Sequence, residues 1–179
     1  MFEGMSSLAS FEGEKGISHL ITSNNTKTSI DIKFIFSGCQ SLPEIYIKQF
    51  KDWKLENKLI TFQGVFTNCK LLTTATTTAT ETDTLKNLFN NYNYSNSDTI
   101  SIQSIFEGCT GLTDIEMPAL NIGLNGATKA FANCFSAVPD TDTTSTRVLN
   151  LQKVDFSNEI SDGLLTMLDK CLAKTIYFK

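Results

Sequence analysis

The sequence predicts an α/β solenoid, in which stacked repeats place a parallel β-sheet on one face and short helical turns on the other. Three observations predict it. One phrase of apolar residues recurs along the chain, all five cysteines occupy the same place in that phrase, and an alternating apolar pattern follows most copies. Self-similarity at a period of a few tens of residues is typical of stacked repeat arrays.

The recurring phrase is apolar-x-x-apolar-Phe-x-(Gly or Asn)-Cys-x-x-Leu. Apolar offsets of three, four and seven lie on one face of a helix, so each copy predicts a short helical turn. The Gly or Asn after the Phe tolerates the left-handed conformation that ends a helix. In the first copy Met5 stands where the others have cysteine. Copies, some of them loose, occur at residues 2–8, 32–42, 62–72, 102–112, 127–134 and 164–172.

The cysteines are predicted to be buried, unbridged and unreactive. Five is an odd number, which argues against a closed disulfide framework. Each thiol shares the inward face of its turn, where a free cysteine behaves as a small hydrophobe. Neighbouring helical turns are expected about 8–10 Å apart, which is too far for a disulfide. A zinc site is not expected, because there is no Cys-x-x-Cys pair and His19 is the sole histidine.

A strand is predicted after most phrases, from the pattern Leu-x-x-apolar-x-apolar. Its last two apolar positions alternate with polar ones, as a strand with one buried face requires. Pro118 follows one copy directly and fits a strand end. The copies are Leu8 and Phe11; Leu42, Ile45 and Ile47; Leu72 and Ala75; Leu112, Ile115 and Met117; and Leu151, Val154 and Phe156.

Three copies of the phrase resemble BspA-type leucine-rich repeats. They are Met-Phe-Glu-Gly-Met-Ser-Ser-Leu (1–8), Phe-Ser-Gly-Cys-Gln-Ser-Leu (36–42) and Phe-Glu-Gly-Cys-Thr-Gly-Leu-Thr-Asp-Ile (106–115). They are equally similar to the related repeats of bacterial surface lipoproteins. The resemblance implies a single leucine-rich-repeat domain of about six repeats over residues 1–179. The spacing is less even than in that family. The polar stretch at 12–31 is predicted as a loop, and the Thr-rich stretches at 73–84 and 136–147 are predicted as exposed edge strands or loops, with O-glycosylated or low-complexity segments as the alternative.

Composition and charge argue against several classes of function. The net charge is −4 and Arg147 is the single arginine, which disfavours nucleic-acid binding. No apolar run is long enough to span a bilayer, and no signal peptide is visible. Ser18 beside His19 lacks an orienting carboxylate, and Asp140 with Asp142 are too few for a calcium site. We therefore expect no enzymatic activity, no cofactor and no metal.

A surface is the remaining candidate for function. Residues two and four after each phrase-ending Leu are predicted to face outward, in rows about 4.8 Å apart. Five carboxylates against one lysine make these rows acidic, which fits either a partner-binding face or a solvated face that keeps the protein soluble. The predicted outward residues are Ser10, Glu12, Glu44, Tyr46, Thr74, Thr76, Asp114, Glu116, Lys153 and Asp155.

Three functions follow as hypotheses. The resemblance implies an extracellular or cell-surface adhesion module that binds a host or bacterial protein. The free thiols and the lack of a visible signal peptide favour a structural or receptor-binding component of a larger particle, such as a bacteriophage virion. A carbohydrate-binding module using Tyr46, Trp53, Tyr92 or Tyr94 is a weaker hypothesis. Because the first residues lie inside a repeat, the chain is expected to be part of something longer or to pack end to end against another subunit.

Overall fold

The protein is built from short parallel strands joined by tight turns, with little helix. The computed structural model describes residues 2–8, 29–31, 33–42, 59–72, 74–75, 100–137, 146–159 and 161–179. The described elements are β1 (Ser29–Asp31), β2 (Leu59–Thr61), β3 (Thr74–Ala75), β4 (Asp114–Glu116), β5 (Leu120–Asn121), β6 (Val148–Asn150), β7 (Val154–Asp155), α2 (Ser161–Met167) and β8 (Thr175–Tyr177).

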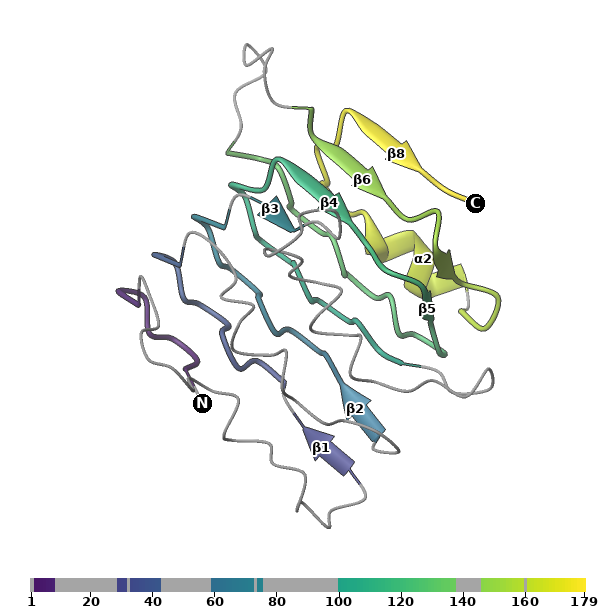
Figure 1. The fold of residues 1–179 in the computed structure, drawn as a ribbon, viewed down its shortest axis with the longest axis horizontal. Coiled ribbons are helices and arrows are strands. Elements are labelled where there is room, and N and C mark those ends of the chain that lie inside the picture. Colours follow the sequence, from purple (N-terminus) through teal and green to yellow (C-terminus); the bar gives the residue numbers. More distant parts are fainter. Residues whose placement is uncertain are drawn as a thin grey trace.

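All pairings between these strands are parallel, and the sheets do not close into a barrel. The larger sheet has the order β3-β4-β6-β8, and two smaller sheets pair β1 with β2 and β5 with β7. Neighbouring strands come from successive parts of the chain, so the described segments follow one another across the molecule in sequence order (Figure 1). We call each segment that contains one copy of the phrase, with its flanking strands, a unit. No helix among the described residues is long and apolar enough to cross a bilayer.

Each unit has two strand positions, of which the sequence analysis predicted one. The strands β3, β4, β6 and β8 follow the phrases; β3 and β4 lie where a strand was predicted, whereas β6 does not. The strands β1, β2, β5 and β7 precede them, and isolated bridges from Thr61 to Ser101 and from Ile100 to Ile122 connect this second row. The prediction of a loop over residues 12–31 was therefore wrong for 29–31, which form β1. An isoleucine followed directly by a polar residue, at 30, 60 and 100, was the available signal.

The phrases form turns rather than the predicted helices, except in the last unit, where α2 is helical. Four of the turn segments contain two residues with positive φ, four positions apart, and a right-handed helix cannot pass through such residues. The amides donate instead to the next unit: Phe66 N lies 3.0 Å from Ile105 O, and Asn68 N lies 2.7 Å from Glu107 O. The positive-φ pairs are Phe34 and Gly38, Gly64 and Asn68, Ser104 and Gly108, and Lys129 and Asn133.

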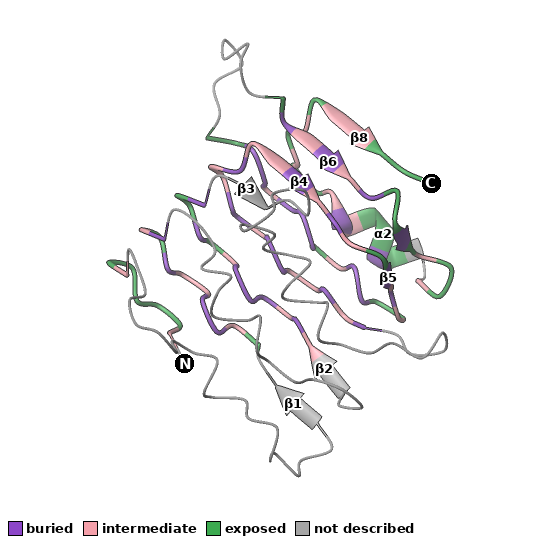
Figure 2. Ribbon diagram, in the orientation of Figure 1, coloured by how far each residue is buried: buried purple, intermediate pink, exposed green. Residues whose placement is uncertain are grey.

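The core consists of the apolar positions of the phrase, as predicted. The described apolar, Phe, Cys and Leu positions of the copies that begin at 32, 62, 102 and 127 are all buried (Figure 2). The last unit departs from the prediction, because Met167 is buried but Leu164 and Leu172 are 39% and 49% exposed. Its apolar face is thus only partly covered by the described residues.

The strand predicted from Leu151, Val154 and Phe156 was assigned the wrong register. The structure pairs Ile115 with Leu149 and Leu120 with Val154, so Leu151 takes the place of Met117. The position equivalent to Leu112 is Thr146, so this copy lacks the leucine that marks the others. Consequently Val148 and Asn150, not Lys153 and Asp155, occupy the positions equivalent to Asp114 and Glu116.

Candidate functional site

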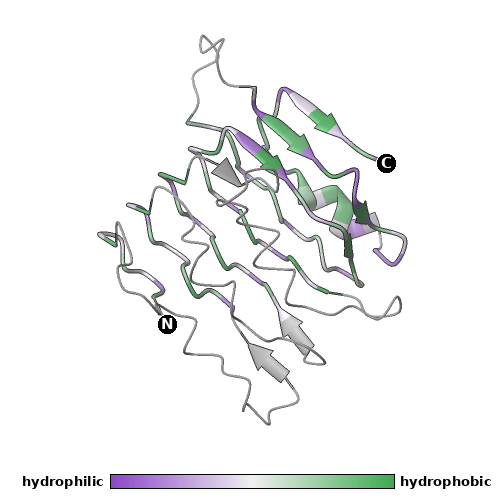
Figure 3. Ribbon diagram, viewed as in Figure 1, coloured by the Kyte–Doolittle hydropathy of each residue, from purple (hydrophilic) through white to green (hydrophobic). Residues whose placement is uncertain are grey.

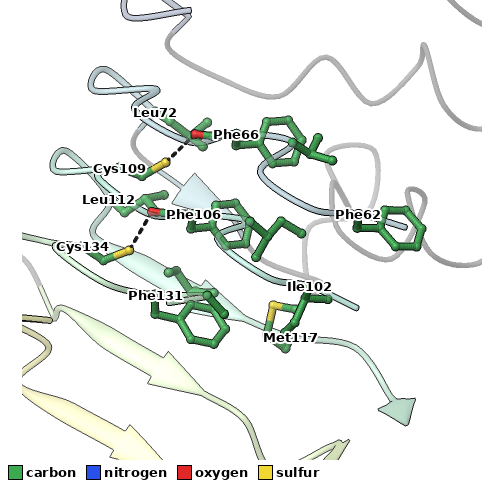
Figure 4. Packing of buried hydrophobic residues seen from close by; sticks show 14 of the residues in the cluster. Phe62, Phe66, Leu72, Ile102, Phe106, Cys109, Leu112, Met117, Phe131 and Cys134 are labelled. Atoms are coloured by element: carbon green, nitrogen blue, oxygen red, sulfur yellow. Dashed lines mark hydrogen bonds between the residues drawn. The ribbon is translucent and has the colours of Figure 1, made fainter. Parts of the chain in front are cut away.

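A stack of phenylalanine rings runs through the core, one ring from each of five consecutive units. Figure 4 shows three of these rings, Phe66, Phe106 and Phe131. The centroid distances are 5.6 Å between Phe2 and Phe36, 5.8 Å between Phe36 and Phe66, 5.6 Å between Phe66 and Phe106, and 6.3 Å between Phe106 and Phe131. Each pair is stacked, with planes inclined by 3° to 20°. The stack shows that the units keep a nearly constant spacing although the sequence between them varies in length.

Beside the rings, four thiols donate hydrogen bonds from one unit to the preceding one. The Sγ–O distances are 3.2 Å from Cys39 to Phe2, 3.2 Å from Cys69 to Phe36, 2.9 Å from Cys109 to Phe66 and 3.0 Å from Cys134 to Phe106. We call these four cysteines the thiol ladder. A carbonyl oxygen has two lone pairs, and the Phe106 oxygen also accepts the Cys109 amide at 3.0 Å. The Cys134 thiol therefore donates to the second lone pair of the Phe106 oxygen, which the hydrogen bond within the turn does not use.

The predicted burial of the cysteines is confirmed for the thiol ladder, whereas Cys171 is half-buried, and all five are unbridged. The predicted spacing between turns was wrong, because direct backbone hydrogen bonds join them and helix-to-helix distances do not apply. Burial raises the pKa of Cys69 to about 12 and raises the pKa of Cys109 and Cys134 well above the usual value. Protonated thiols are poor nucleophiles and poor metal ligands, so the ladder is structural.

The candidate partner-binding surface lies on the sheet β3-β4-β6-β8. Its register aligns Thr74, Asp114, Val148 and Thr175 in one column, and Glu116, Asn150 and Tyr177 in another. The column between them contains Ile115 and Leu149, which are buried. Figure 3 shows the resulting alternation of hydropathy along β4. We call Asp114, Glu116, Val148, Asn150, Thr175 and Tyr177 the outer face; the last four are the members that sequence reasoning missed.

The two described carboxylates of this face connect neighbouring units. Asp114 accepts hydrogen bonds from the Thr146 hydroxyl and, at 3.4 Å, from the Val148 amide. Glu116 Oε1 lies 2.7 Å from Lys153 Nζ. Lys153 thus offsets the charge of the column without belonging to it. The described part of the outer face is therefore less acidic than the predicted rows.

Asp155 lies away from the outer face, in β7 of a smaller sheet. Its carboxylate accepts the Ser157 amide at 2.9 Å, and this hydrogen bond lowers the pKa of Asp155. The predicted residues Ser10, Glu12, Glu44, Tyr46 and Thr76 lie outside the described residues, as do His19, Trp53, Tyr92, Tyr94, Asp140 and Asp142.

Chemistry-bearing side chains do not gather elsewhere in the described part of the chain. Within those residues, no three His, Cys, Asp or Glu side chains are grouped so that they could hold a metal ion. Comparison of the chain with protein-family models, with curated proteins and with solved structures finds no match in any of the three.

Proposed function

We propose that this chain is a protein-interaction module, without enzymatic activity, that folds as a leucine-rich-repeat solenoid of the BspA type and works at a cell surface or outside the cell. It binds a protein partner through the outer face. The observation that carries this proposal is the strand register, which lines up outward side chains of successive units in two columns.

The repeated contacts between neighbouring units support the solenoid. The ring stack, the thiol ladder and the amide-to-carbonyl bonds each connect a unit to the next in sequence order. The thiol hydrogen bonds span between 28 and 43 residues of sequence, and the ring spacing stays between 5.6 and 6.3 Å. A repeat array accommodates such insertions on its surface because each unit needs to contact only its neighbours.

Binding is favoured over catalysis by the state of the reactive groups. The buried thiols are hydrogen-bonded and have raised pKa values, and Asp114 and Glu116 hold neighbouring units together. The same contacts hold the outward side chains in place, and the exposed ring of Tyr177 at the end of β8 adds an aromatic contact group. Fixed side chains on an extended sheet lose little conformational entropy on binding.

Site-specific photocrosslinking tests the outer face. A benzophenone amino acid replaces Asn150 in β6, and in a matched protein it replaces Lys70, an exposed residue of a turn segment. We expect a protein from extracts of candidate host or bacterial surfaces to crosslink through position 150 and not through position 70. Binding of that purified protein should then weaken about tenfold or more in Asn150→Arg, with the melting temperature retained.

The proposal is contradicted if both positions capture the same proteins equally, or if Asn150→Arg binds the captured protein with the affinity of the wild type. Turnover of a substrate by the purified chain would contradict the non-enzymatic assignment separately.

A further inference from the structure

The turn that precedes the fourth phrase contains Asn125 followed by Gly126, which is the single Asn-Gly pair of the sequence. Asparagine is a thermolabile residue, because the backbone nitrogen of the next residue can attack its side-chain amide carbon. A glycine at that next position obstructs the attack least, since it has no side chain. Asn125 is exposed, and its side-chain amide makes no hydrogen bond to another described residue. The pair therefore combines a reactive sequence with an accessible side chain.

Packing between units requires the glycine of this pair. A Cβ on Gly126 would lie 2.8 Å from the carbonyl oxygens of both Gly123 and Ile100, and 2.9 Å from Cγ2 of Ile122. The two oxygens belong to the backbone and have no room to move aside in a closely packed interior. Replacement of Gly126 by a larger residue is therefore not open to this fold, and the labile pair is retained with it.

The closed turn holds the reactive nitrogen in a hydrogen bond. Gly126 N donates to Gly123 O at 2.8 Å. Glu159 closes the turn, because its two carboxylate oxygens accept Asn125 N at 2.8 Å and Ala127 N at 2.7 Å. The nitrogen must leave its acceptor before it can attack, so the reaction proceeds from a turn that has opened locally. The contact with Glu159 thus determines how often the nitrogen is free to react.

We propose that Asn125 is a site of spontaneous deamidation, and that the modification releases the contact between this turn and Glu159. Gly126 N forms a bond to Cγ of Asn125, and the side-chain nitrogen leaves as ammonia, so that a cyclic succinimide remains. Water then adds to either carbonyl carbon of the ring, which gives aspartate or isoaspartate at position 125. Water is the one co-reactant, and nothing is oxidised or reduced.

Both products disturb the contact with Glu159. Each adds a carboxylate next to the one that accepts the amide of residue 125, and like charges repel. In isoaspartate the main chain also gains one atom between the nitrogens of residues 125 and 127, so the two N–H groups no longer match the two oxygens of one carboxylate. The modified turn should therefore stay open. The proposal concerns this turn and not the outer face, so it is independent of the proposed function.

Peptide mass spectrometry of the 179-residue protein, after incubation in mildly alkaline buffer below its melting temperature, tests the site. The chain contains its own matched controls. Asn68 and Asn133 have φ of 60° and 57°, close to the 57° of Asn125, but each precedes a cysteine. We expect aspartate and isoaspartate to accumulate at position 125 while positions 68 and 133 remain asparagine.

A variant of Glu159 tests whether the contact controls the reaction. Glu159→Gln weakens the closed turn, so the open fraction and the rate of conversion of Asn125 should both rise about 5- to 30-fold. The rate follows the open fraction because deamidation is slow compared with opening and closing. The control Glu107→Gln removes a surface ion pair to Lys129 and should leave the rate within about twofold of the wild type.

A variant of Asn125 tests the consequence of the modification. Asn125→Gly accommodates the left-handed conformation of this position and has no side-chain amide to lose. The melting temperature of the wild type should fall during the incubation, in step with the conversion of Asn125. The melting temperature of Asn125→Gly should stay constant over the same time.

Three results would each overturn the proposal. The first is conversion of Asn125 in the folded protein no faster than that of Asn68 and Asn133. The second is an unchanged rate in Glu159→Gln, and the third is a converted protein that melts at the temperature of the fresh one.

Discussion

At the scale of single residues, cysteine suits its place in the phrase because it is both small and a weak donor. The Cys109 side chain is fully buried and its thiol reaches the Phe66 carbonyl at 2.9 Å. The cost of burying its charged form appears as a raised pKa. This cost makes stability depend on pH in the alkaline range.

We predict that the free energy of unfolding falls as pH rises from about 9 to about 12. The unfolded state ionises its thiols near the ordinary pKa of 9.0, whereas the folded state keeps Cys69 protonated up to about 12. The stabilisation is complete below the lower value and is lost as pH rises through the higher one. One such thiol contributes a slope of at most about 1.4 kcal/mol per pH unit. Urea unfolding at several pH values measures it.

The matched variants for this prediction are Cys69→Ala and Cys171→Ala. All other ionisable groups are common to both variants and to the wild type. The slope should flatten by about one proton in Cys69→Ala and by less in Cys171→Ala, because Cys171 is half-buried. Equal slopes in Cys69→Ala and the wild type would refute the role assigned to burial.

At the scale of the elements, positive φ determines the turn segments. Gly4 and Gly108 have nearly the same φ, 75° and 73°, at equivalent places in two units. A Cβ on Gly4 would meet nothing within 4 Å, but one on Gly108 would overlap the side-chain oxygen of Asn68 in the preceding unit. Alanine substitution at Gly4 therefore measures the free-energy cost of a left-handed L-residue alone. Alanine substitution at Gly108 adds the cost of steric overlap with Asn68 of the preceding unit.

We predict that Gly4→Ala costs about 1 kcal/mol, the penalty for a left-handed L-residue, and that Gly108→Ala costs at least about 1 kcal/mol more. Thermal or urea unfolding of both variants measures the difference. Equal losses would show that Asn68 moves aside freely.

The junction between turn and helix depends on Glu159. In an earlier unit Ile102 N donates to Gly126 O at 2.8 Å. The residue equivalent to Gly126 in the last unit is Gly163, and it lies within α2, where backbone carbonyls bond along the helix. Glu159 supplies the missing acceptors, because its two carboxylate oxygens accept Asn125 N at 2.8 Å and Ala127 N at 2.7 Å.

We predict that Glu159→Gln destabilises the protein by about 1–2 kcal/mol, because an amide offers one acceptor where two donors converge. The control Glu107→Gln removes a surface ion pair to Lys129, of 3.8 Å, and should cost about 0.5 kcal/mol or less. Urea unfolding of the two variants compares them, and a Glu159→Gln protein as stable as Glu107→Gln would contradict the capping role.

At the scale of the whole molecule, the ring stack makes the core continuous across the described units. Phe66 stacks on Phe36 at 5.8 Å and on Phe106 at 5.6 Å, and it is fully buried. Phe2 stacks on one described ring only and is half-buried. Loss of a ring in the middle should therefore weaken contacts to two neighbours.

We predict that Phe66→Ala costs about 3–5 kcal/mol, as for other buried aromatic residues. Phe2→Ala should cost clearly less, because that ring is only half-buried and less apolar surface is exposed when it is lost. Circular dichroism during urea unfolding measures both. A similar loss in the two variants would indicate that the stack is not the continuous core described above.

The sequence analysis predicted the interior of the molecule well. The positions of Ile105, Phe106, Cys109 and Leu112 within the phrase were enough to predict their burial, because the same spacing recurs. The strand around Ile115 was predicted for the same reason. The preceding strands were missed because each is only two or three residues long, which is too short a pattern to stand out.

The candidate site was predicted only in part. Asp114 and Glu116 were placed on an outward column, and Lys153 and Asp155 were placed wrongly, because the copy that begins at Thr146 lacks the marking leucine. The ion pair between Glu116 and Lys153 also lowers the negative charge of the outer face. The contact between Glu116 and Lys153 joins residues 37 positions apart, and no local pattern specifies it.

By itself, the sequence determined which side chains are inside in the units whose phrases begin at 32, 62, 102 and 127, since the repeated spacing of apolar residues and cysteines leaves one consistent interior there. Only the tertiary structure determined the backbone conformation of the segments that carry these side chains. Positive φ at two places in four of the turns prevents a helix there, and the amides of these turns donate to carbonyl oxygens of the next unit. Hydrogen bonds between units are long-range in sequence, so the apolar pattern of one unit cannot distinguish a helical turn from the turns observed.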